Sequence, residues 1–201
     1  TTMEKGCYSQ MFSGCTALKS APELPAEALA TNCYRYMFRG CSALTSAPEL
    51  PATTMEQGCY FGMFSECTGL TSAPELPAKE LAYNCYGKMF KGCSALASAP
   101  ELPATKMEAY CYNSMFANCT GLTSAPELTA KRLESNCYQH MFEVCTSLSS
   151  APELPATELV SNCYQLMFKD CSKLRYVKAL FTTSPSEETT KDWLSGVAAS
   201  G

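Results

Sequence analysis

The strongest constraint on the fold is a period of 26 residues that runs through almost the whole chain. Two series of cysteines both advance by this step, and most units continue through a leucine into the segment SAPELPA. A fixed period of about 20–50 residues is typical of solenoids, propellers and repeat arrays. The two series are Cys7, Cys33, Cys59, Cys85, Cys111, Cys137 and Cys163, and Cys15, Cys41, Cys67, Cys93, Cys119, Cys145 and Cys171.

A single unit is too short to enclose a hydrophobic core, so the units must stack on one another. Four-stranded propeller blades would need more strand signal per unit than this sequence supplies. We therefore expect an α/β solenoid with short parallel strands, short helical or 3-10 segments and polyproline-like corners.

One unit illustrates this expectation. Cys33, Met37 and Cys41 recur at helical spacing, which predicts a short helical or 3-10 segment. Proline has no backbone N–H and is excluded from central strands. Pairing between coils should thus be confined to a short strand over residues 44–47, and Pro48 and Pro51 should form a corner.

The repeat divides the chain into two parts. Residues 1–181 are predicted to form seven coils, the first truncated at its start and the last divergent, which suggests a fragment of a longer array. Residues 182–201 are expected to be a capping helix or the start of a further module. Ser184-Pro185-Ser186-Glu187 resembles a helix start, and a helix from about Pro185 to Ser195 follows from it.

Fourteen cysteines leave several hypotheses open. Cysteines eight apart on a helix lie about 12 Å apart, too far for a disulfide within one unit. Bridges between units would require the helix to be broken. The alternative is two ladders of small buried thiols, while soft-metal binding lacks the usual CxxC spacing and histidine partners.

Glutamates also recur, once in each corner. Stacked carboxylates about 5 Å apart repel one another, so this row should face solvent. A calcium-binding stripe is the alternative. The row comprises Glu23, Glu49, Glu75, Glu101, Glu127 and Glu153.

Several functional classes receive no support from the sequence. The net charge is −4 and no basic block is present, which argues against a nucleic-acid partner. No apolar run is long enough to span a membrane. The single histidine, His140, occupies a freely varying position, and no triad, nucleotide motif or cofactor motif is found. We therefore expect no enzymatic activity, no cofactor and no metal centre.

The positions that vary between units are the candidate binding surface. Two residues after each CY pair, and two before each second cysteine, change from unit to unit. Solenoids use extended faces for binding, although neutral drift would give the same variation. The candidate residues are Arg35, Tyr36, Phe61, Lys88, Asn113 and His140.

The motif MFxGCxxLTSAPELPATTM, with its 26-residue step, resembles the BspA-like leucine-rich repeat surface proteins. In that family the Met-Phe pair, the following cysteine and the next leucine form the recurring core. The resemblance covers residues 1–181 and implies a right-handed leucine-rich-repeat solenoid with a parallel sheet. It also implies an extracellular or cell-surface location and adhesion to an unknown protein or glycan, such as a host surface or matrix protein. The alternative is a passive structural spacer within a larger surface protein.

Overall fold

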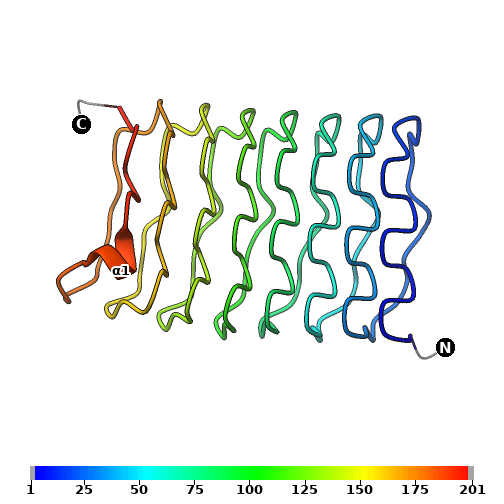
Figure 1. Cartoon of the computed structure of the whole chain (residues 1–201), viewed down its shortest axis with the longest axis horizontal. Coiled ribbons are helices and arrows are strands. Elements are labelled where there is room, and N and C mark those ends of the chain that lie inside the picture. The colour runs from blue at the N-terminus through cyan, green and yellow to red at the C-terminus, as the bar shows by residue number, and fades with distance from the viewer. Residues whose placement is uncertain (1–2, 199–201) are drawn as a thin grey trace.

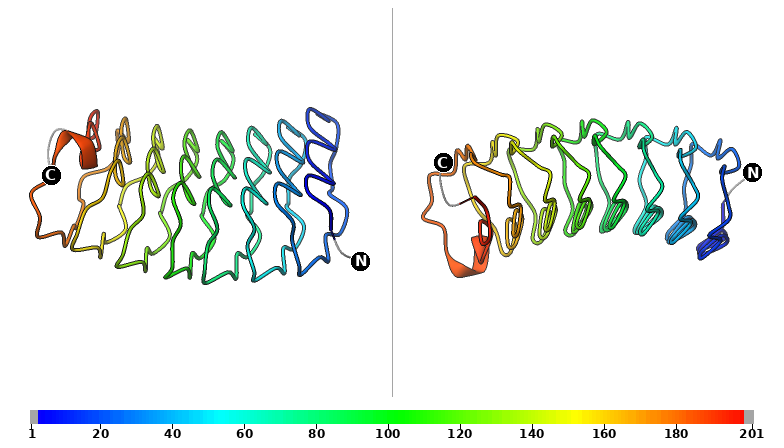
Figure 2. Two further views of the ribbon diagram at one scale, coloured as in Figure 1. Left: turned by 60° about the horizontal axis from the view of Figure 1, so that its bottom comes forward. Right: turned by 90° about the horizontal axis from the view of Figure 1, so that it is seen from above.

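The computed structural model describes residues 3–198. The chain forms a row of coils, one for each 26-residue unit, and coils consecutive in sequence lie side by side (Figure 1). Each coil is a flattened loop with a tightly wound segment on one side and an extended segment on the other (Figure 2).

The tightly wound segment is a succession of turns and not the helical or 3-10 segment that its spacing predicts. In the second coil the amides of Cys33, Met37 and Cys41 each donate to the carbonyl three residues earlier, at 3.1 Å. We call this segment the turn ribbon. The turn ribbons are residues 6–15, 32–41, 58–67, 84–93, 110–119, 136–145 and 162–171.

The intervening residues of the turn ribbon bond to the next coil, which explains why no helix forms. In the second coil Asn32, Tyr36 and Gly40 have positive φ angles of 56°, 55° and 72°. These left-handed residues rotate alternate peptide groups so that they point along the stack. Five amides per coil then donate to carbonyls of the following coil, for example Tyr34 to Cys59 at 2.9 Å.

The extended side of each coil is the proline arm, residues 44–55 in the second coil and its equivalents. Parallel pairing occurs just before the prolines, as in Ser46 with Ser72, and again after them, as in Thr54 with Glu80. The predicted pairing over residues 44–47 is confirmed, but its confinement to that segment is wrong, because a second bridge forms at Thr54. The pairing is limited to isolated bridges, because proline removes the donors that a longer strand needs.

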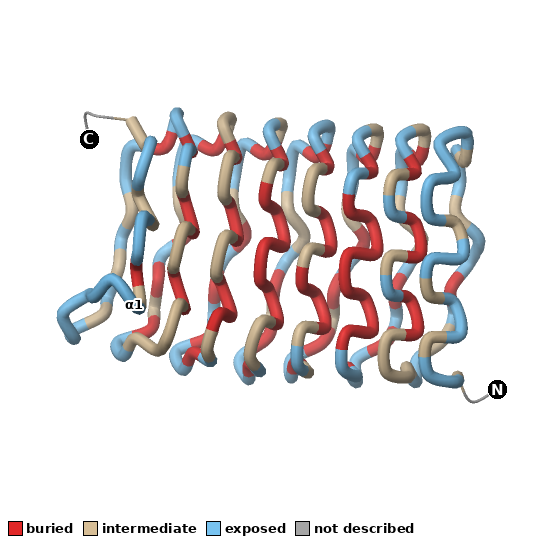
Figure 3. Tube along the Cα trace, viewed as in Figure 1, coloured by how far each residue is buried: buried red, intermediate tan, exposed pale blue. Residues whose placement is uncertain are grey.

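The core consists of ladders of identical side chains running through the coils. Consecutive tyrosines, such as Tyr60 and Tyr86, stack with ring centroids 5.9 Å apart, and phenylalanines such as Phe64 and Phe90 stack at 5.8 Å. Such offset parallel pairs add to the gain from burying apolar area. Buried residues therefore dominate the turn ribbons of the middle coils, whereas the first turn ribbon is mostly exposed (Figure 3).

The two cysteine series join these ladders as free thiols. Each thiol of the second series from Cys41 onward donates to the carbonyl of a phenylalanine in the preceding coil. Cys67 bonds to the Phe38 oxygen at 3.0 Å and Cys93 to the Phe64 oxygen at 3.1 Å. Buried cysteine ladders, one of the three hypotheses for these residues, are thus what the structure shows for Cys33 and the cysteines after it.

The C-terminal segment differs from the expected helix over Pro185–Ser195. Helix α1 spans only Glu187–Thr190. The chain then returns to the ribbon geometry, with positive φ at Asp192 and Gly196. The backbone amide of Phe168 donates to the Trp193 carbonyl at 2.9 Å, and the backbone amide of Asp170 donates to the Ser195 carbonyl at 2.7 Å. An eighth row of turns therefore lies on the seventh turn ribbon, because a helix would leave those amides without partners.

Regular secondary structure is scarce in this architecture. Among residues 3–198, α1 is the only helix, and β pairing is confined to isolated bridges. The stacked tyrosine, phenylalanine and cysteine ladders establish a repeat structure. No helix within the described range is long and apolar enough to cross a membrane.

Candidate binding surface on the turn ribbons

Variable residues of the second, third and fourth coils form a cluster of cations around two aromatic rings. The rings of Tyr36 and Phe61 meet edge to face with centroids 5.1 Å apart. The Arg35 guanidinium carbon lies 4.9 Å from the Phe61 centroid, and the Lys88 ammonium nitrogen lies 5.6 Å from it. We call Arg35, Tyr36, Arg39, Phe61 and Lys88 the cation–aromatic patch.

Glycines in the next coil make room for the two rings. A Cβ atom on Gly62 would lie 2.3 Å from the Tyr36 ring, and one on Gly87 would lie 3.0 Å from the Phe61 ring. Each aromatic side chain therefore leans over a glycine at the equivalent position of the following coil. The variable positions are consequently not independent, since a large residue in one coil requires a small one in the next.

The charges of the patch are only partly neutralised. Arg39 binds Glu66 through two hydrogen bonds of 3.3 and 3.2 Å, which is the bidentate geometry that suits a guanidinium. Arg35, Lys88 and the nearby Lys91 have no carboxylate within ion-pair distance among the described residues. The patch thus carries an excess of positive charge on an acidic protein.

The pKa of Lys88 is affected by its burial and by this excess of positive charge. Its side chain is half-buried, and this burial lowers the pKa of its ammonium group. The neighbouring cations Lys91, Arg35 and Arg39 lower the pKa further. A positive charge held among other positive charges favours binding of an anion.

The other two candidate residues lie farther along the stack, each with its own polar partners. Asn113 is buried, and its amide donates to the Gln139 oxygen at 2.8 Å. Gln139 donates in turn to Gln165. The His140 Nδ1 atom lies 2.8 Å from a Glu143 oxygen. These side chains are satisfied within the protein, so they add no free charge to the surface.

The glutamate row faces solvent, as predicted. Shallow grooves separate successive corners, and one of about 370 Å³ lies between Pro74–Pro77 and Pro100–Pro103. Glu75 and Glu101 line this groove and are both exposed. Nowhere in residues 3–198 do three or more acidic, histidine or cysteine side chains converge as metal ligands.

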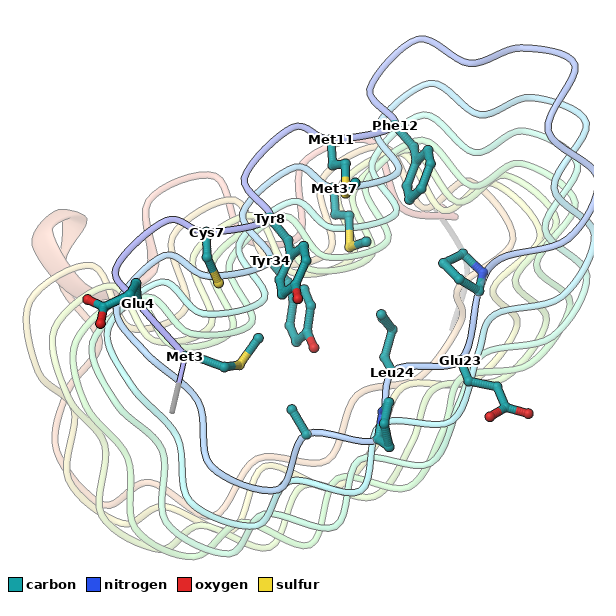
Figure 4. Close-up of a pocket in the computed structure, with 13 residues that line it drawn as sticks. Met3, Glu4, Cys7, Tyr8, Met11, Phe12, Glu23, Leu24, Tyr34 and Met37 are labelled. Carbon is teal, nitrogen blue, oxygen red and sulfur yellow. The ribbon is translucent and has the colours of Figure 1, made fainter. Parts of the chain in front are cut away.

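A larger cavity, of about 640 Å³, opens at the first described coil. It is lined by Cys7, Tyr8, Met11 and Phe12, whose side chains point toward the proline arm (Figure 4). Tyr34 lies beneath Tyr8, and Met37 lies beneath Met11. These residues are the first members of the core ladders. The cavity is therefore a cross-section of the core rather than a separate site.

Part of this surface was predicted from the sequence. Arg35, Tyr36, Phe61 and Lys88 were candidates from their variability, and the structure brings these four together. Arg39 and Glu66 were missed, although both occupy variable positions before a second cysteine. The signal that could have found the arrangement is the alternation of aromatic residues with Gly62 and Gly87 one unit later.

The chain matches no protein-family model, no curated protein and no solved structure.

Proposed function

We propose that this chain is a non-catalytic binding module whose ligand surface is the cation–aromatic patch and the turn ribbons around it. The observation that carries the proposal is the pair of cations, Arg35 and Lys88, on one aromatic ring with no carboxylate partner among the described residues. Surface arginines and aromatic residues contribute strongly to protein interfaces.

We also propose that the stack is a right-handed, leucine-rich-repeat-type solenoid related to the BspA-like surface proteins. The 26-residue step and the ladders of cysteine, tyrosine, methionine and phenylalanine support this assignment. A cell-surface location and a role in adhesion follow from that resemblance. An exposed, rigid row of coils suits such a role because it presents many side chains at fixed spacing.

The test is a panel of immobilised matrix and serum proteins. We expect saturable binding of the wild-type chain to at least one of them. Replacing Arg35 and Tyr36 by the residues of the first coil (R35S/Y36Q) should weaken that binding about tenfold or more, because large charged and aromatic contacts are removed. Serine and glutamine already occupy these positions as Ser9 and Gln10, so the fold should tolerate them.

The matched control is E49Q, a change in an exposed residue of the proline arm. It should bind as the wild type does. Absence of saturable binding to every protein of the panel, or equal binding of R35S/Y36Q, would refute the proposed role and favour a passive spacer.

A further inference from the structure

We infer that the cation–aromatic patch binds a short acidic peptide segment of a partner protein. This inference rests on the proposed function and specifies the chemistry of the partner. It starts from Arg35, whose guanidinium carbon lies 4.9 Å from the Phe61 ring centroid and 5.4 Å from the Tyr36 ring centroid.

The N–H donors of the Arg35 guanidinium are free for a ligand. Its side chain makes no hydrogen bond and no ion pair with the described residues. A guanidinium in a cation–π contact keeps its N–H donors, and these can bind a carboxylate bidentately. Arg39 shows the same recognition inside this protein, because it binds the carboxylate of Glu66.

A second cation lies at a distance that an extended peptide can span. Lys88 lies two coils beyond Arg35, with Phe61 between them. Coils joined by backbone hydrogen bonds are about 5 Å apart, so two steps correspond to about 10 Å. In a peptide with polyproline-type extended geometry, residues three apart lie on the same side and are about 9 Å apart. Two carboxylates at that spacing can meet Arg35 and Lys88 together.

The surroundings favour a short acidic segment over a long polyanion such as a sulfated glycan. The excess positive charge ends at the fourth coil, since the equivalent positions of the fifth coil are Asn113 and Ser114. The later turn ribbons carry no excess of cations, since Lys169 pairs with Glu143 and Asp170 adds a further carboxylate. A continuous polyanion laid along the stack would find no further net positive charge there, whereas a peptide with a few acidic residues and polar flanks needs none.

The experiment uses two synthetic peptides, Gly-Ser-Glu-Glu-Glu-Glu-Ser-Gly and the same peptide with glutamine at every glutamate. Binding to the whole chain is measured by calorimetry or by chemical shifts at low and moderate salt. We expect the glutamate peptide to bind, the affinity to fall as salt rises, and the glutamine peptide not to bind. Heparin and inorganic sulfate are tested in parallel.

The decisive variant is R35Q/K88Q, which should weaken binding of the glutamate peptide about tenfold. The matched control is K131Q/R132Q, which removes the same charge from two exposed residues outside the patch and should retain wild-type affinity. Circular dichroism verifies that both variants are folded.

Three results would overturn the inference. The first is no binding of the glutamate peptide at millimolar concentration, and the second is an equal loss of affinity for this peptide in R35Q/K88Q and K131Q/R132Q. The third is preferential binding of heparin or free sulfate. The two proposals can fail separately. A protein ligand from the panel that is lost in R35S/Y36Q but retained in R35Q/K88Q would leave the binding module standing and remove only the acidic peptide.

Discussion

The buried cysteines supply two properties that a phenylalanine ladder lacks, which are small size and a hydrogen-bond donor. A thiol is small and apolar enough for the core, and it still donates a hydrogen bond. Cys119 uses it on the Phe90 carbonyl at 3.0 Å, and Cys145 on the Phe116 carbonyl at 3.1 Å. Burial raises the pKa of these thiols, to about 12 for Cys67. Because the thiolate is the reactive form, they should be inert at neutral pH.

The difference in exposure between the cysteines predicts a two-step thiol titration. Cys7 and Cys15 are exposed and the other twelve cysteines are buried. With a disulfide exchange reagent at pH 8, the native chain should release about two equivalents quickly. In denaturant all fourteen should react. A C7S/C15S variant should lose the fast phase.

Two results would contradict this account of the cysteines. Fewer than fourteen thiols in denaturant would indicate disulfides, and fourteen fast thiols in the native chain would mean that the ladders are not packed.

At the scale of the element, the turn ribbon depends on left-handed residues at every fourth position. Most first and third left-handed positions hold glycine, asparagine or aspartate, which tolerate this conformation. Val144 is an exception, with φ of 61°. A β-branched residue there is strained, because its side chain crowds the backbone.

We therefore predict that V144N stabilises the protein by about 1 kcal/mol. Chemical denaturation of the wild type and the variant measures the free energy of unfolding. The control is V160N, since Val160 is also half-buried but has no positive φ. That change should be neutral or destabilising, and a similar loss in both variants would argue against strain at Val144.

The same element shows where sequence reasoning succeeds and where it fails. The period, the inward ladders and the proline corners follow from residue spacing and from the chemistry of proline. The prediction of a helical or 3-10 segment was wrong, because Cys33, Met37 and Cys41 also fit a period of four residues. On a helix the eighth residue would drift by about 80°, yet Cys33, Met37 and Cys41 are all fully buried. Asn32 and Gly40 lie at left-handed positions, and these residue types are the sequence signal for turns that the prediction overlooked.

The cation–aromatic patch could be predicted only in part, because its geometry depends on how aromatic rings in one coil fit over glycines in the next.

At the scale of the whole molecule, burial of a core residue depends on its neighbours along the stack. Met11 and Met89 occupy the same position in the first and fourth coils. Met11 is 58% exposed, whereas Met89 is fully buried. Since each coil contacts only the adjacent coils, the stability of such a molecule is approximately a sum over coils and their interfaces.

One substitution made at these two positions tests that description. We predict that M89A lowers the free energy of unfolding by about 2–5 kcal/mol, because it leaves a cavity between two coils. The change M11A should cost at most about 0.5 kcal/mol, as expected for an exposed side chain. Urea denaturation, followed by circular dichroism and by tryptophan fluorescence, gives both values and shows whether the coils unfold together. Since Trp193 contacts Tyr164 near the last turn ribbon, its fluorescence reports one end, and circular dichroism reports the whole stack. Equal losses for M11A and M89A would mean that the methionines do not lie in a ladder buried by stacking, and the coil arrangement itself would be wrong.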